Sequence, residues 1–296
     1  NQSIYHRLNL ILTTSIEIMK NIQIIGITIA AVIDKLSESI FPFIGILTNS
    51  SGTASYFHLE GSSNQSVGSF NASDIGIGVF KSGGTATANG YISCFDLWNG
   101  NQSSGSNSGT FAVNDETVHV TKLFGYLGTL QVSGTGLFHI YNSNDSFLSG
   151  MTLDVDGGEF RIGDLASDNE ADLDMSSGII DISGGTIKIC DELDVADGTI
   201  TISGGNLNIG AYTGSSDGTD ADRFEMEAGT LNLTGGTINI YGQKSSTSKD
   251  ALDLDAGVTV NATTSNTINL AAGQGSNDED MYMTVGGNEL GNLTIS

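Results

Sequence analysis

One short sequence pattern recurs four times between residues 173 and 270. The copies read LDMSSGIIDISGGTIKI at 173–189, LDVADGTITISGGNLNI at 193–209, FEMEAGTLNLTGGTINI at 224–240 and LDLDAGVTVNATTSNTINL at 252–270. Each copy holds three triplets in which two apolar residues flank a third residue, and glycine-bearing turns separate most of them. A period of two within a triplet is typical of a strand with one buried face. Repetition at a period of about twenty residues or more indicates stacked repeats.

The apolar flanks of the triplets form the predicted core. A single repeat cannot bury its apolar side chains alone, so the repeats must stack. The sequence therefore predicts a mainly β fold, a parallel β-helix or β-solenoid with about 20–30 residues per coil, over residues 121–296. The predicted inward residues are Leu173, Met175, Ile180, Ile182, Ile187 and Ile189, then Leu193, Val195, Ile200, Ile202, Leu207 and Ile209, then Phe224, Met226, Leu231, Leu233, Ile238 and Ile240, and finally Leu252, Leu254, Val258, Val260, Ile268 and Leu270.

Residues 1–48 differ in character from the repeats. Their apolar residues recur with heptad-like spacing, which predicts one long amphipathic helix ending before Pro42. We expect this segment to serve in assembly or in capping the repeats. Residues 19–33 also resemble a secretory signal, and the many isoleucines leave room for strands. A membrane span is disfavoured, because the uncharged run at 21–33 is too short to cross the hydrocarbon layer.

Residues 49–120 form a third predicted region. They are rich in Ser, Gly and Asn and contain short apolar islands, which predicts irregular β structure. The whole chain carries 34 acidic and 10 basic residues, for a formal net charge of −24. Such a charge disfavours nucleic acid and anionic membranes as partners. It fits cation binding, a high-salt setting or simple solubility.

The acidic residues include one regular column. The central residue of an LDV-like triplet is acidic in successive repeats, and stacking in register would place neighbouring carboxylates about 4.8 Å apart. Such a column is either a solvated acidic face or a set of calcium ligands, and calcium is the one cofactor that we consider. The column consists of Asp154, Asp174, Asp194, Glu225 and Asp253. The central residues of the third triplets, Lys188, Asn208, Asn239 and Asn269, predict a structural amide ladder.

The two cysteines and the sequons bear on localisation. Cys94 and Cys190 fit no zinc or redox motif, so they are candidates for a disulfide with each other or with another molecule, or for free thiols. Cys190 follows Ile189 and is expected to face outward. Several Asn-x-Ser/Thr sequons favour a secreted or cell-surface glycoprotein, although a chain rich in Ser, Thr and Asn yields some by chance. They begin at Asn1, Asn49, Asn64, Asn71, Asn101, Asn144, Asn232, Asn261 and Asn292.

Motifs for catalysis are weak. Residues 214–218 match the letters of a nucleophile elbow without its strand-to-helix context, and residues 246–249 match S-x-x-K in the same empty way. The four histidines show no metal-binding spacing, and His119 and His139 should face outward from strands. We therefore expect no enzymatic activity.

The SGGTIKI, SGGNLNI and TGGTINI segments resemble the glycine-rich coils of right-handed parallel β-helix proteins from microbial surfaces, such as haemagglutinin-like adhesins, autotransporter passengers and envelope proteins. The resemblance covers residues 130–296. Some proteins of this fold are polysaccharide lyases or hydrolases that use basic residues or clustered aspartates. Here the basic residues are scattered along the sequence, at Arg161, Lys188, Arg223, Lys244 and Lys249.

These observations lead to three functional hypotheses. The leading one is an extracellular structural protein whose copies self-assemble into a filament, a sheath or a surface layer, because the open end of a solenoid exposes strand edges. The alternatives are a surface adhesin that binds glycans and, less favoured, a polysaccharide lyase or hydrolase. Fold alone does not decide among them.

Overall fold

The computed structural model describes residues 55–100, 109–141, 146–163, 171–210, 223–241, 250–270 and 283–295. These residues fold as strands and turns, include no helix and belong to one compact unit. Within them, no helix meets the length and hydropathy that a membrane crossing requires. The predicted segment at 1–48, with its helix, lies outside the described residues.

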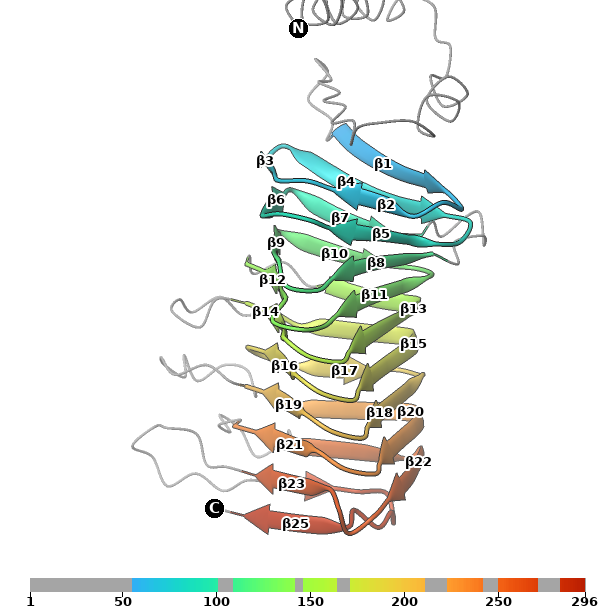
Figure 1. The fold of residues 1–296 in the computed structure, drawn as a ribbon. Coiled ribbons are helices and arrows are strands. Elements are labelled where there is room, and N and C mark those ends of the chain that lie inside the picture. The colour runs from blue at the N-terminus through green and yellow to red at the C-terminus, as the bar shows by residue number, and fades with distance from the viewer. Residues whose placement is uncertain are drawn as a thin grey trace, which may run out of the picture. The chain divides into compact units, whose positions relative to one another are not determined.

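The described residues form two large parallel sheets (Figure 1). Sheet A has fifteen strands: β1 (Ser55–Gly61), β2 (Gln65–Val67), β4 (Ile75–Lys81), β5 (Thr85–Ala88), β7 (Asp96–Asn99), β8 (Thr110–Val113), β10 (Lys122–Gly125), β11 (Thr129–Val132), β13 (Ser146–Val155), β15 (Leu173–Ile182), β17 (Leu193–Val195), β18 (Thr199–Ile202), β20 (Phe224–Leu233), β22 (Leu252–Ala262) and β24 (Met283–Thr284). Sheet B has ten strands: β3 (Phe70–Ala72), β6 (Ile92–Cys94), β9 (Thr117–Val120), β12 (Leu137–Ile140), β14 (Glu159–Ile162), β16 (Thr186–Ile189), β19 (Asn206–Ile209), β21 (Thr237–Ile240), β23 (Thr267–Leu270) and β25 (Asn292–Ile295).

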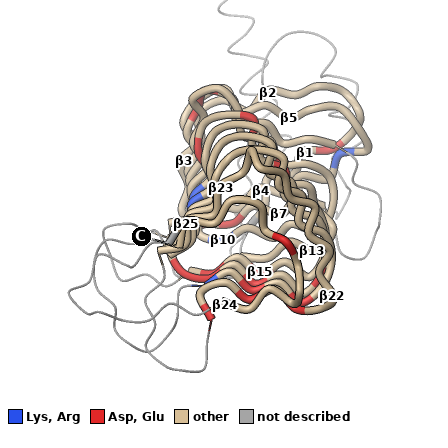
Figure 2. Tube along the Cα trace, turned by 90° about the horizontal axis from the view of Figure 1, so that it is seen from below, with Lys and Arg blue, Asp and Glu red and all other residues tan. Residues whose placement is uncertain are grey.

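Successive repeats pair in register. In sheet B, Thr186 pairs with Asn206, Asn206 with Thr237, and Thr237 with Thr267, all between parallel strands. Each repeat therefore adds one strand to this sheet, and the strands of successive repeats overlie one another when viewed along the stack (Figure 2). The predicted mainly β fold with parallel strands is confirmed, and the arrangement is consistent with a parallel β-helix.

Sheet A bends along a row of glycines. Gly178, Gly198 and Gly229 lie between the first and second triplets of their repeats, and their φ angles of 121°, 135° and 104° are ones that side chains rarely tolerate. The bend divides sheet A into two faces. Face A1 comprises β1, β4, β7, β10, β17, β24 and the first halves of β13, β15, β20 and β22; face A2 comprises β2, β5, β8, β11, β18 and the second halves of those four long strands. Sheet B forms the third face, face B.

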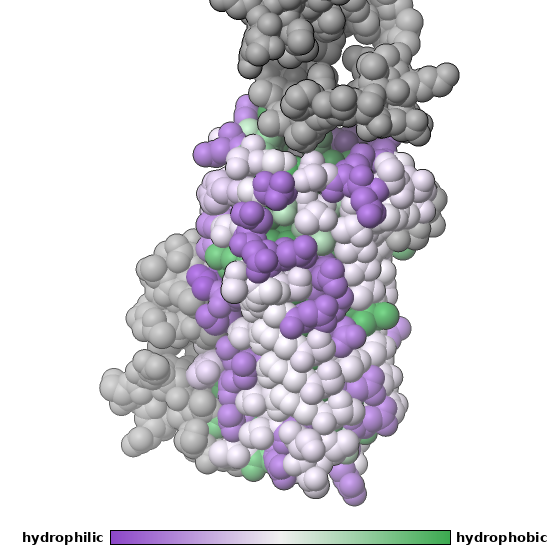
Figure 3. Space-filling model, in the orientation of Figure 1, coloured by the Kyte–Doolittle hydropathy of each residue, from purple (hydrophilic) through white to green (hydrophobic). Residues whose placement is uncertain are grey.

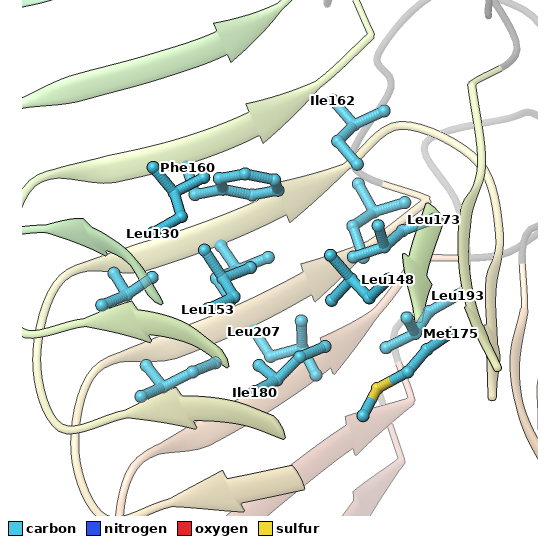
Figure 4. Close-up of a cluster of buried hydrophobic side chains, with 14 of the residues drawn as sticks. Leu130, Leu148, Leu153, Phe160, Ile162, Leu173, Met175, Ile180, Leu193 and Leu207 are labelled. Atoms are coloured by element: carbon cyan, nitrogen blue, oxygen red, sulfur yellow. The ribbon is translucent and has the colours of Figure 1, made fainter. Parts of the chain in front are cut away.

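The core lies inside these faces. All eighteen inward residues predicted for the first three copies are at most 1% exposed. Leucine, isoleucine, methionine and phenylalanine side chains from sheets A and B meet there (Figure 4). The prediction of alternating burial is therefore confirmed for these copies.

In the fourth copy, the second triplet lies two residues later in the sequence than predicted. Leu231 pairs with Val260 and Leu233 with Ala262, so Val258 is not the equivalent of Leu231. β22 carries one extra residue between Leu254 and Gly257, where the register against β20 shifts. The bulge moves the second triplet along the strand. Because the triplet lies two residues from its predicted place, the same side of the strand still faces inward.

Residues 55–120 belong to the same two sheets as the repeats. They form the strands from β1 to β9, and β8 pairs with β11 while β9 pairs with β12. Phe111 and Val118 are fully buried in the common core. The irregular β structure expected here is therefore a continuation of the parallel stack.

Candidate functional site

The acidic column is largely present on face A1. Asp174 pairs with Asp194, Asp194 with Glu225, and Glu225 with Asp253. Asp and Glu residues gather beside β15 and β24, where Lys and Arg are few (Figure 2). These four carboxylates form one ladder along the stack.

Asp154 does not belong to this ladder. It pairs with Asp181 on face A2, and the residue of its repeat that pairs with Asp174 is Phe147. The LDV triplet at 153–155 occupies the second position of its repeat, although it has the letters of a first triplet. The prediction that Asp154 joins the column is therefore wrong.

Two carboxylates of the ladder, Glu225 and Asp253, have raised pKa values. Burial raises the pKa of Asp253, and Asp250 and Asp255 add to the rise. Burial also raises the pKa of Glu225, and Arg223, which is paired with Glu225 and Glu192, opposes the rise. Among the described residues, no group of three or more His, Cys, Asp or Glu side chains is arranged to hold a metal ion. Calcium binding stays a prediction.

The same outward column becomes aromatic in the earlier repeats. Continuing from Asp174, its members are Phe147, Phe124 and Trp98. The ring centroids of Trp98 and Phe124 lie 4.4 Å apart, and those of Phe124 and Phe147 lie 5.1 Å apart. Tyr126 lies 5.5 Å from Phe147 and 5.7 Å from Trp98, and Tyr56 lies 6.0 Å from Trp98. We call these five rings the aromatic cluster.

Two charged groups border the aromatic cluster. The Tyr56 hydroxyl donates to Asp96 Oδ2 at 3.3 Å, and Thr121 Oγ1 donates to Asp96 Oδ1 at 3.1 Å. Burial raises the pKa of Asp96, and these hydrogen bonds oppose the rise. Lys122 Nζ lies 5.3 Å from the centre of the Phe124 ring, within the range of a cation–π contact.

A glycine opens space for the cluster. A Cβ added at Gly76 would lie 2.4 Å from the Tyr56 ring, so the ring occupies the place of a side chain. Sequence reasoning missed the cluster because its rings lie in residues assigned to irregular structure and to weak repeats. The segments FDLW at 95–98 and KLFGY at 122–126 contain aromatic residues, but the sequence does not show how these segments align between repeats.

Face B carries a second polar column. His119 pairs with His139, His139 with Arg161, and Arg161 with Lys188. The two imidazole rings lie 5.1 Å apart, and burial lowers the pKa of His119, with Arg161 adding to the shift. Both histidines occupy the predicted outward positions, although His139 is only 8% exposed because its neighbours cover it. Arg161 and Lys188 are separated in the sequence but are neighbours in the stack, so the expectation that the basic residues do not cluster is wrong for this pair. Lys244 and Lys249 lie outside the described residues.

The column continues as an amide ladder. Asn239 Nδ2 donates to Asn208 Oδ1 at 2.7 Å, and Asn269 Nδ2 donates to Asn239 Oδ1 at 2.8 Å. The predicted amide ladder is confirmed. It satisfies polar side chains along the stack and so has a structural role.

The cysteines do not pair with each other. Cys94 ends β6 and Cys190 follows β16, which lies four strands away in sheet B, or about 19 Å at ~4.8 Å per strand. A disulfide needs Cα atoms within about 7 Å, so the predicted bridge between them is wrong. The outward orientation predicted for Cys190 is also wrong: the strand ends at Ile189, and Cys190 is 4% exposed. Burial raises the pKa of Cys94 to about 12, which makes its thiol a poor nucleophile.

The sequons differ in accessibility. Asn64, Asn71, Asn261 and Asn292 are exposed, whereas Asn232 is half-buried. Asn232 donates to Thr201 Oγ1 at 3.2 Å and accepts from Asn261 Nδ2 at 2.9 Å. The Asn232 amide is therefore a poor acceptor for a glycan, and glycosylation elsewhere stays a prediction. Asn1, Asn49, Asn101 and Asn144 lie outside the described residues, as do the motifs at 214–218 and 246–249.

Comparison with known proteins gives no relative. No protein-family model, no curated protein and no solved structure matches this chain. The two outward columns are therefore interpreted from their chemistry alone.

Proposed function

We propose that this chain is a non-enzymatic β-solenoid of the cell surface or the extracellular space, and that it binds polysaccharide through the aromatic cluster. The observation that carries the proposal is the in-register column of Trp98, Phe124 and Phe147 on the outward side of face A1. All three rings are partly exposed. Elsewhere the surface seen in Figure 3 is mainly hydrophilic or neutral. Grouped apolar side chains on the outside of a protein mark an interaction site.

Sugars suit this surface chemically. The apolar faces of pyranose rings pack against aromatic rings, and their hydroxyl groups need nearby donors and acceptors. The Tyr56 hydroxyl donates its proton to Asp96 and so offers its oxygen as an acceptor at one side of the cluster, and Lys122 supplies an ammonium. The column presents one ring in each of three successive layers, at Trp98, Phe124 and Phe147, so a linear polymer lying along it contacts one ring after another.

The hypothesis of self-assembly stays a prediction, as does the hypothesis of a polysaccharide lyase or hydrolase. Glycan binding is compatible with assembly, because the aromatic cluster lies on the side of the stack. The adhesin hypothesis named no binding residues from the sequence, and the aromatic cluster now supplies candidates.

Affinity electrophoresis through gels that contain neutral polysaccharides tests the proposal. We expect the protein to be retarded by at least one of them, and Trp98→Ala to reduce the affinity at least tenfold. Tyr91→Ala is the matched control, because it removes a ring that is 45% exposed on another part of the surface. Thermal melting verifies that both variants fold. Retention of full binding by folded Trp98→Ala, or no retardation of the wild type in any gel, would overturn the proposal.

A further inference from the structure

Arg161 and Lys188 form a cationic pair on face B. They are cross-strand partners, and their side chains are 24% and 26% exposed. Both contact one carboxylate: Arg161 Nε donates to Glu159 Oε1 at 2.6 Å, and Lys188 Nζ lies 2.6 Å from Glu159 Oε2. Burial alone would raise the pKa of Glu159, but Lys188 and Arg161 lower it. Two cations sharing one anion leave an excess of one positive charge.

The column that holds this pair is unlike the other two. The outward column of face A1 contains Asp174, Asp194, Glu225 and Asp253. The outward column of face A2 contains Asp154 and Asp181. The column of face B contains no acidic residue among those that the structure describes: Asn71, Ser93, His119, His139, Arg161, Lys188, Asn208, Asn239, Asn269 and Thr294. The positive excess is thus not neutralised along its column, although the chain carries a net charge of −24.

We propose that face B holds a site for the carboxylate or sulfate groups of an acidic polysaccharide, centred on Arg161 and Lys188. The guanidinium binds such oxyanions through two parallel hydrogen bonds, and the ammonium binds them as a point charge. A ligand anion competes with Glu159 for the two cations. The site uses no residue of the aromatic cluster, so it stands or falls independently of the proposed function.

A polysaccharide suits the pair better than a nucleic acid. Duplex DNA carries one charge per ~1.7 Å and requires several phosphate contacts, whereas two cations in an acidic protein offer few. An acidic polysaccharide needs only one charged group at the pair, while its uncharged groups lie along the histidines and the amide ladder. Binding of duplex DNA is therefore an outcome of the test that counts against the site.

The test compares dextran, carboxymethyl dextran and dextran sulfate as labelled probes, at about 0.15 M salt, where charges beyond ~8 Å are screened. We expect the charged dextrans to bind at least tenfold more tightly than dextran. Binding of only one charged probe identifies its group as the ligand, and binding of both identifies charge as sufficient. Arg161→Gln and Lys188→Gln should each weaken the binding of the charged probe at least fivefold.

Two further variants separate binding from folding. Glu159→Gln should strengthen the binding several-fold, because it frees both cations, whereas a merely structural ion pair would give no gain. Arg223→Gln is the matched control, since Arg223 lies on face A1 between two carboxylates and its loss should leave probe binding unchanged. Equal affinity for dextran and the charged dextrans, no gain in Glu159→Gln, an equal loss in Arg223→Gln, or DNA binding as tight as that of dextran sulfate would each overturn the proposal.

Discussion

At the scale of single residues, stacking turns the central acids of the repeats into mutual neighbours. The folded-state pKa values of Glu225 and Asp253 lie above their ordinary values, so the folded chain binds these protons more tightly than the unfolded chain. The resulting stability is fully present below the unfolded pKa values and is lost as the pH rises through the raised ones. On acidification these two carboxylates therefore favour the folded state, whereas His119, whose pKa burial lowers, opposes it.

We expect the melting temperature of the wild type to gain more, or lose less, than that of Asp253→Asn as the pH falls from 7 toward about 4, the ordinary range of a carboxylic acid. Asp253→Asn should raise melting at pH 7 and reduce the gain on acidification. Glu289→Gln removes one exposed carboxylate and controls for net charge. Equal changes of the melting temperature with pH in the wild type and in Asp253→Asn would contradict the prediction.

The calcium prediction rests on the four carboxylates of the ladder on face A1, Asp174, Asp194, Glu225 and Asp253. Screening works through ionic strength, so sodium reproduces it, whereas coordination requires calcium and raises the melting temperature in a saturable way. The comparison is thermal melting in chelator, in millimolar calcium and in sodium chloride of matched ionic strength, for the wild type and for Asp174→Asn with Asp194→Asn. Coordination predicts that calcium adds stability to the wild type only. If calcium adds nothing beyond sodium, the ladder is a solvated face.

At the scale of strands and turns, the glycine pairs that precede the strands of sheet B leave no room for a side chain. Gly205 has a φ of +65°, and a Cβ there would lie 2.5 Å from the Gly185 carbonyl oxygen. Its equivalents Gly185 and Gly236 have φ angles of 62° and 69°. The turns of neighbouring repeats therefore approach each other backbone to backbone, and no side chain fits between them.

Gly205→Ala should destabilise the fold by at least about 1–3 kcal/mol, the range for a residue held in a left-handed conformation. Gly68→Ala is the matched control, because a Cβ at Gly68 meets nothing within 4 Å and its φ is not in that region. Urea denaturation of both variants measures the difference. Equal midpoints would show that the turn can relax.

The sequence alone predicts the core of the strong repeats, because the period of two specifies which side chains point inward. It does not predict what lies beside an outward residue, since the partner is set by register across repeats of unequal length. Asp154 was misplaced for that reason, and Trp98, Phe124 and Phe147 were not recognised as a column. Burial of polar groups was missed as well: Lys81 is fully buried, and its Nζ donates to Ser63 O at 2.7 Å and to Gln65 Oε1 at 3.2 Å.

At the scale of the whole molecule, the leading prediction is self-assembly. A stack of parallel strands presents unpaired edges wherever it is not covered, and residues 1–48 are apolar enough to need a partner surface. We expect electron microscopy to show regular polymers of the full chain, and deletion of residues 1–41 to abolish them while the β signal in circular dichroism remains. Discrete monomers of the full chain would end this hypothesis, and polymers of the truncated chain would remove the segment from it.

The connections from sheet B to the next strand of face A1 vary greatly in length. Residues 190–192 join β16 to β17, whereas residues 210–223 join β19 to β20 and residues 241–251 join β21 to β22. The register on both sides is nonetheless unbroken, with Asp194 opposite Glu225 and Asn208 opposite Asn239. Closing a longer loop adds little entropic cost. We therefore expect this corner of the stack to tolerate inserted peptides, so that what the surface presents there can change without refolding the repeats.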